Sequence, residues 1–197
     1  QSGKRIIGTP AVSEGMVVFG SADRNIYGLN AENGQLLWKI EALEPVIGAV
    51  TIDNGLAYVG ASDHTFRAID IHTGKVVWSY DKVKGYIETK PLITDNKVIF
   101  GAWDNTLYAL DKNDGKEIWK WTGGLTRMHF SPAAVWPVAA EGKVFIADPQ
   151  RALTAIDINN GETVWRTFES QVRETVGLSE DGKQIYSKTM NDSIVCY

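Results

Sequence analysis

The residues best suited to bind a ligand lie close together in the second half of the 197-residue chain. Arg127, His129 and Trp136 fall in and just after the stretch 122–130. A guanidinium, an imidazole and an indole side by side could hold an anion or a peptide. Further candidates of the same kind follow along the chain: Asp148, Arg151 and Arg173.

The sequence carries no pattern typical of an enzyme. We find no phosphate-binding glycine loop, no His-x-x-x-His pair and no Ser-His-Asp set. The single cysteine, Cys196, cannot form an internal disulfide or a cysteine-rich metal site. We therefore expect no catalytic, metal-binding or cofactor-binding residues.

Composition narrows the classes of partner. The net charge of −4 argues against a dedicated nucleic-acid binder, which usually has a basic patch. Hydrophobic residues make up 44% of the chain, which is typical of a globular protein. No apolar run approaches the length of about 18 residues that crosses a bilayer, so we expect no membrane span.

An internal repeat supplies the elements that position the candidate residues. Residues 68–78 carry the pattern Ala-x-Asp-x-x-Thr-Gly-x-x-x-Trp, and related copies occupy 28–38, 109–119 and 155–165. In every copy the Trp follows the Gly by four residues. The four tryptophans are Trp38, Trp78, Trp119 and Trp165.

Each repeat predicts four short strands. The first follows a Pro, as at Pro10, Pro91 and Pro137, and the second is a β-branched and aromatic run. The third carries the Ala-x-Asp pattern, and the fourth ends in the Trp. About five such units of about 40 residues predict an all-β fold, a β-propeller of four-stranded blades. A sandwich or closed barrel is the competing interpretation, but neither requires one four-strand sequence to recur five times.

The units divide the chain into a single propeller domain or a fragment of one. Their approximate bounds are 8–47, 48–88, 89–130, 131–172 and a partial 173–197. Four full units and a partial fifth do not close a ring comfortably, so we expect a piece of a propeller with about 6–8 blades. An open arc exposes blade faces and strand edges, which favours self-association or a companion propeller fragment.

Two sets of repeated residues have structural interpretations. We expect each Trp of the repeat to pack across the gap against the neighbouring blade. Asn30, Asp70, Asp111 and Asp157 precede the Gly turn, where a short polar side chain accepts backbone N–H groups. Because a catalytic residue is needed once and not once per blade, we do not interpret these carboxylates as catalytic.

The repeated motif resembles that of the quinoprotein-like, or PQQ-like repeat, propeller family over almost the whole chain. The resemblance implies that the four tryptophans dock blades. The family includes quinone-dependent alcohol dehydrogenases and non-enzymatic scaffolds of the bacterial outer-membrane assembly machinery. The dehydrogenases hold a quinone with calcium, an Asp base and often a vicinal cysteine pair, which one cysteine cannot supply. We therefore expect neither PQQ nor calcium.

A narrower resemblance concerns the stretch from residue 131 through residue 149. This stretch looks like propellers attached to calcineurin-like phosphoesterase domains in some bacterial proteins. The metal-ligand motif of such an enzyme does not occur in this sequence.

The six candidate residues admit two interpretations. The Trp spacing widens from 40 and 41 to 46 residues in the fourth unit, and the extra residues fall in 122–130. This loop precedes a first strand, so we expect it at one rim, where loops on a rigid scaffold often bind partners. The alternative is an ordinary long loop with an Arg-Asp pair that satisfies itself. His64 and His72 lie in predicted turns, where solvent exposure explains them.

These observations favour a non-enzymatic propeller scaffold that binds a protein or an extended peptide. The alternative is part of an enzyme, either a quinone dehydrogenase fragment or the accessory domain of a phosphoesterase. The family resemblance implies an exported bacterial protein, in the periplasm, secreted or at the cell surface.

Overall fold

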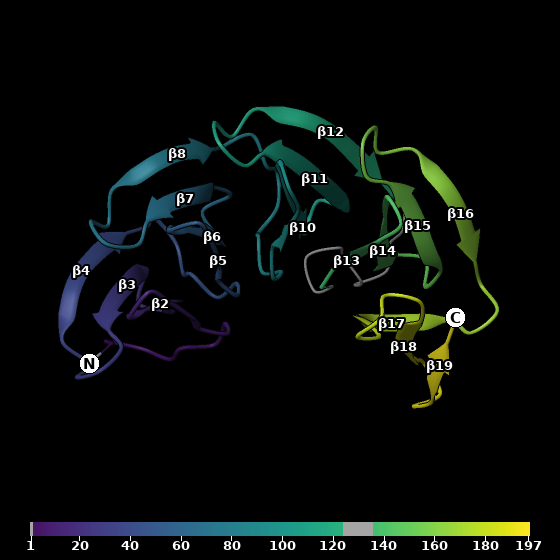
Figure 1. Cartoon of the computed structure of the whole chain (residues 1–197), viewed down its shortest axis with the longest axis horizontal. Coiled ribbons are helices and arrows are strands. Elements are labelled where there is room, and N and C mark those ends of the chain that lie inside the picture. The colour runs from purple at the N-terminus through teal and green to yellow at the C-terminus, as the bar shows by residue number, and fades with distance from the viewer. Residues whose placement is uncertain (1, 124–135) are drawn as a thin grey trace.

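The computed structural model describes residues 2–123 and 136–197 and contains five antiparallel sheets (Figure 1). Four sheets have four strands and the last has three. Within the described residues every regular element is a β-strand. The predicted all-β propeller of four-stranded units is confirmed.

Each sheet is built from consecutive strands. The first contains β1 (Ala11–Ser13), β2 (Met16–Gly20), β3 (Asn25–Asn30) and β4 (Leu36–Glu41). The second contains β5 (Thr51–Asp53), β6 (Leu56–Gly60), β7 (Phe66–Asp70) and β8 (Val76–Tyr80). The third contains β9 (Leu92–Ile93), β10 (Lys97–Ala102), β11 (Thr106–Asp111) and β12 (Glu117–Thr122). The fourth contains β13 (Val138–Ala140), β14 (Lys143–Ala147), β15 (Leu153–Asp157) and β16 (Thr163–Thr167), and the fifth contains β17 (Val172–Leu178), β18 (Ile185–Thr189) and β19 (Ile194–Cys196).

Two boundaries differ from the sequence-based ones. The prediction that the fourth strand ends in the Trp was wrong, because β4 continues to Glu41 and β12 to Thr122. These extra residues keep pairing with the third strand, as Ile26 does with Ile40. The fifth sheet begins at Val172, one residue before the predicted unit.

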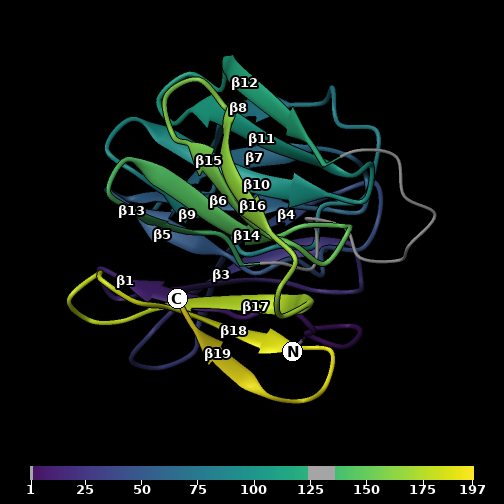
Figure 2. The ribbon, with the colours of Figure 1, turned by 90° about the vertical axis from the view of Figure 1, so that its right-hand side faces the viewer.

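The sheets follow one another along an arc, with β4, β8, β12 and β16 on its convex side (Figure 1). Figure 2 turns the molecule by 90° and places the last sheet, β17 to β19, at the end opposite β12. Because successive strands are antiparallel, each sheet has two kinds of end. We call the end with the connections into the first strands (2–10, 42–50 and 81–91) and the second-to-third hairpins the loop rim. The other end, with the first-to-second and third-to-fourth turns, is the turn rim.

The short turns of the turn rim follow from residues that tolerate a left-handed backbone. Glu14 and Gly15 both have positive φ, 50° and 73°, and Asn54 and Gly55 repeat this pair at 46° and 72°. Two successive positive φ values fit the twist of a tight β-hairpin. The sequence signals at these turns therefore fix where the first and second strands pair.

The hydrophobic core consists of layers between neighbouring sheets. The layer between the first and second sheets includes Val18, Val46 and Ile69. Between the second and third sheets, the rings of Phe66 and Phe100 stack with centroids 4.0 Å apart. Since each sheet buries its faces against its neighbours, the joints between blades account for much of the fold's stability.

Candidate functional site

Three of the repeated tryptophans make the same hydrogen bond to the next sheet. The indole Nε1 donates to the backbone carbonyl of the residue after the turn Asp in that sheet. The pairs and donor–acceptor distances are Trp38 to Ile71 (2.6 Å), Trp78 to Lys112 (3.0 Å) and Trp119 to Ile158 (2.9 Å). Each Trp thus lies against the third-to-fourth turn of its neighbour.

The turn glycines explain why the Trp and the Gly recur together. A Cβ on Gly74 would lie 2.7 Å from the ring of Trp38, and one on Gly115 would lie 2.5 Å from the ring of Trp78. Both glycines also have φ near 70°. A side chain would therefore meet both a steric clash and a strained backbone.

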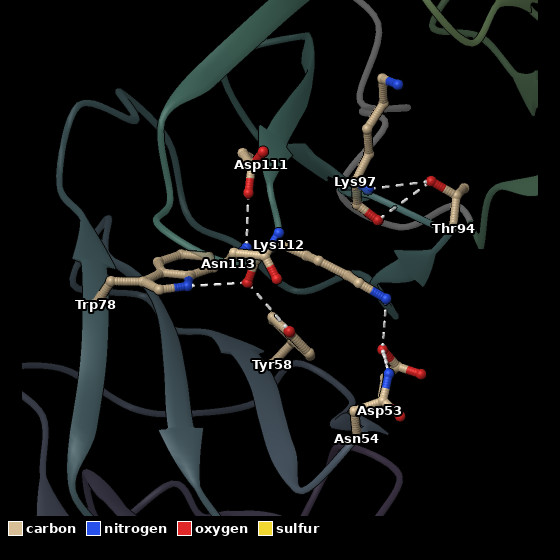
Figure 3. A network of polar contacts seen from close by, with 9 residues as sticks. All are labelled: Asp53, Asn54, Tyr58, Trp78, Thr94, Lys97, Asp111, Lys112 and Asn113. Atoms are coloured by element: carbon tan, nitrogen blue, oxygen red, sulfur yellow. Dashed lines mark hydrogen bonds and ion pairs between the residues drawn. The ribbon is translucent and has the colours of Figure 1, made fainter.

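Figure 3 shows the joint between the second and third sheets in detail. The Lys112 carbonyl accepts hydrogen bonds from Trp78 and from the Tyr58 hydroxyl, the latter at 3.1 Å. The Lys112 Nζ reaches back to Asp53 at 2.8 Å. Burial, together with the charges of Asp53 and Asp111, raises the pKa of Tyr58 to about 12. The Tyr58 hydroxyl therefore remains a protonated donor at neutral pH.

Trp165 has a different environment from the other three. It is half-buried, and its ring lies 5.9 Å from that of Phe145, between centroids. It lines a cleft with Ile185 and Tyr197. Within the described residues its indole N–H has no acceptor, and the fifth sheet has no third-to-fourth turn of the kind that accepts this bond elsewhere. The docking role of the four tryptophans remains a prediction for mutagenesis.

The carboxylates of the repeated turn behave as backbone acceptors, as the sequence indicated. The Asp111 Oδ1 accepts the N–H of Asn113 at 2.8 Å, and the Asp70 Oδ1 accepts that of Thr73 at 2.8 Å. Equivalent bonds occur at Asn30 and Asp157.

A second repeated set of Asp residues was missed in the sequence analysis. Asp23, Asp63 and Asp104 each lie in a second-to-third hairpin, and each carboxylate accepts a backbone N–H from the chain entering a first strand. The donors and distances are Gly3 (2.6 Å), Leu43 (3.2 Å) and Lys84 (3.0 Å). The signal was present, because each Asp follows by three residues a Gly at the end of the second strand or one residue before it (Gly20, Gly60 and Gly101).

In the fourth sheet the equivalent hairpin uses its Asp differently. The Asp148 side chain is fully buried and accepts hydrogen bonds from the Thr154 hydroxyl at 2.8 Å and from the Arg166 Nε at 2.9 Å. Its backbone carbonyl accepts the N–H of Arg151. The structure therefore places the Asp148 carboxylate in the interior, paired with Arg166 of β16, and not on an open surface with Trp136.

The remaining candidates are distributed unevenly. Arg127 and His129 lie outside the described residues. Arg151 is half-buried in the β14–β15 hairpin with a φ of 69°, and Arg173 lies on β17, paired in register with Lys188. Among the four candidates that lie in the described residues, Trp136 lines a groove on the loop rim.

The Trp136 groove forms where loops that enter several blades converge. It has a volume of about 230 Å³, and Trp136 shares it with Ile7, Ile47 and Glu88. The Trp136 side chain is 44% exposed, and the Lys90 Nζ lies 5.2 Å from the centre of its ring. An exposed indole with a cation over its face offers apolar area and an ammonium group together.

No group of three or more His, Cys, Asp or Glu side chains in the described residues is arranged to hold a metal ion. Likewise, none of the described elements is a helix long and apolar enough to cross a membrane.

The repeated joints and antiparallel blades define a β-propeller of PQQ-like repeats. The family model described as outer membrane protein assembly factor BamB matches residues 2–196, so the chain belongs to this family. A comparison with curated proteins found no match.

Two solved structures illustrate the shared fold. The crystal structure of BamB from Moraxella catarrhalis aligns with a TM-score of 0.80 at 18% identity, covering 96% of this chain and 60% of that one. The computationally designed Ika8 protein aligns with a TM-score of 0.78 at 20% identity, covering 95% and 57%. The chain thus spans about three fifths of the length of these structures.

Proposed function

We propose that this chain is a non-enzymatic propeller scaffold that binds a protein or an extended peptide at its loop rim. The carrying observation is the exposed Trp136 over a groove that it shares with Ile7 and Ile47. Aromatic side chains that combine apolar area with a polar tip are enriched at interfaces. Membership of a family described as an outer membrane protein assembly factor supports the same proposal.

The family also supports a location. We propose that the chain belongs to an exported bacterial protein that works in the periplasm or at the cell surface, in line with the family's description. Fractionation of the bacterial host should recover the protein with the envelope. Recovery in the cytoplasm would contradict this location.

A site-specific crosslink tests the binding proposal. A photo-reactive amino acid replaces Trp136 on the loop rim, and in a matched control it replaces Glu32, an exposed residue of the turn rim. We expect an adduct with a defined envelope protein from position 136, identified by mass spectrometry, and none from position 32. Equal labelling at both positions, or none at either, would argue against a loop-rim binding surface.

The absence of catalysis is part of the proposal and has its own test. We expect no oxidation of alcohols when quinone and calcium are added, and no hydrolysis of phosphoesters. Turnover that survives repurification would assign the chain to the enzymatic branch.

A further inference from the structure

A second groove on the loop rim lies at the second blade, between the connections into β5 and β9. Its volume is about 510 Å³, and three separate segments line it. Glu44 and Ile47 come from the connection into β5, His64 from the β6–β7 hairpin, and Tyr86 and Glu88 from the connection into β9. The groove adjoins the Trp136 groove, because Ile47 and Glu88 line both.

The two carboxylates of this groove differ from the other acidic residues nearby. Asp63, beside His64 in the β6–β7 hairpin, and Asp104, in the β10–β11 hairpin, are held by hydrogen bonds. In the described residues neither Glu44 nor Glu88 has a side-chain hydrogen bond or an ion pair, although Glu88 is half-buried. A partly buried carboxylate without a cation remains a strong acceptor for an incoming charged donor.

Aromatic rings complete the groove. The rings of His64 and Tyr86 meet edge to face with centroids 5.4 Å apart, and Tyr86 is 51% exposed. His64 has a φ of 64°, a left-handed conformation that the tight hairpin imposes. The hairpin therefore fixes the backbone from which the imidazole reaches Tyr86. Aromatic faces of this kind attract a cation through the ring quadrupole.

We propose that this groove binds a lysine or arginine side chain of an extended peptide segment. The Glu44 and Glu88 carboxylates would receive the charged head, and Tyr86 would cover its aliphatic stem. An acidic side chain would instead face two negative charges at close range. This inference rests on the proposed binding function and specifies the chemistry of the partner.

The adjoining groove extends the expected ligand. A segment that places its cation beside Glu88 can continue across Ile47 to Trp136 and Ile7, which offer apolar contact. The structure thus favours a peptide with a basic residue near a large apolar one over a peptide of either kind alone.

Binding to an immobilised library of ten-residue peptides tests this inference with the full chain. We expect bound peptides to be enriched in Lys or Arg near a large apolar residue, with binding that weakens as salt is raised. The double variant Glu44→Gln and Glu88→Gln should bind the tightest basic peptide with an affinity lower by about tenfold or more. The matched control, Glu32→Gln on the turn rim, should leave the affinity for this peptide unchanged. Equal melting curves should show that all variants fold.

The outcomes separate this inference from the proposed function. If peptides bind but the glutamine variants match the parent, and Trp136→Ala abolishes binding, the cation groove is wrong and the loop-rim function stands. Enrichment of acidic peptides would also overturn the inference. If no peptide binds, the inference fails, and the crosslink at position 136 decides the function independently.

Discussion

The two rims of this propeller are built from the same repeats but use their polar residues in opposite ways. On the turn rim the joints repeat, with an indole bonded to the next blade and a turn carboxylate bonded to its own backbone. On the loop rim the hairpin Asp residues repeat, but the side chains between them do not, and Tyr86, Glu44 and Trp136 remain open to solvent. The rim that is most regular is therefore structural, and the irregular rim is available for binding.

The comparison predicts that substitutions at the joints will change stability, whereas substitutions on the open part of the loop rim will change binding. The expected effects fall in size from the buried joint to the exposed groove. The first experiment compares a residue of the first kind with one of the second, and the others compare a variant with the parent.

The largest effect should follow truncation of a joint tryptophan. Trp78→Ala removes a buried indole and its bond to Lys112, so we expect a loss of roughly 3–5 kcal/mol in the free energy of unfolding. Trp103→Ala removes a Trp that is 38% exposed and should cost much less. Urea denaturation of both variants measures the difference, and equal losses would refute the docking role of Trp78.

The next effect concerns the buried carboxylate of the fourth blade. Asp148→Ala leaves Arg166 and Thr154 without their shared acceptor, and we expect a loss of roughly 2–4 kcal/mol in unfolding free energy. Thermal and urea unfolding measure it. A variant as stable as the parent would show that Asp148 does not hold the hairpin, and would reopen its assignment to a ligand site.

The hairpin Asp of the second blade should make stability depend on pH. Burial opposes ionisation of Asp63, but hydrogen bonds and charge from Arg67, with the N–H groups of Leu43 and Thr65, outweigh it and lower the pKa of the carboxyl. At neutral pH we expect Asp63→Asn to cost roughly 1–2 kcal/mol. Because the pKa of Asp63 is lower in the folded state, its ionised carboxylate stabilises the fold at pH values above the ordinary pKa of Asp. This stabilisation is lost as the pH falls through the pKa of the folded state.

The difference in unfolding free energy between the parent and Asp63→Asn should therefore become smaller as pH falls from about 5 to about 2. The midpoints of urea denaturation at each pH measure this difference. A gap that stays constant, or widens in acid, would contradict the assigned direction of the shift.

The smallest effect on stability is expected at the groove itself. Because Tyr86 is half exposed, Tyr86→Ala should change the free energy of unfolding by only about 0.5 kcal/mol. The same variant should lower the affinity of the groove for the basic peptide. A large loss of stability would place Tyr86 among the structural residues and remove the contrast between the rims.

The blade architecture could be predicted from the sequence because the signals for its strands and turns are local. The Gly and Asp of each turn act within five residues, as at Asp111 and Gly115, and strand alternation acts over a few more. Copies of one local pattern, repeated every 40 to 46 residues, leave few alternatives to a propeller. The sequence by itself therefore determined the order of the strands, the turns and the fold class, whereas the ends of the fourth strands depended on pairing with the third.

The candidate site depended on contacts that no local pattern contains. The sequence left Asp148 either as a binding candidate or as part of an Arg-Asp pair that satisfies itself. In the structure its carboxylate is buried and accepts a hydrogen bond from Arg166, 18 residues away. The sequence indicated that His64 is an exposed turn residue, but its ring contacts that of Tyr86, which lies in the connection into β9. Only the tertiary structure decided which side chains share a groove, because the packing of whole blades brings together loops about 40 residues apart and selects which polar groups are buried.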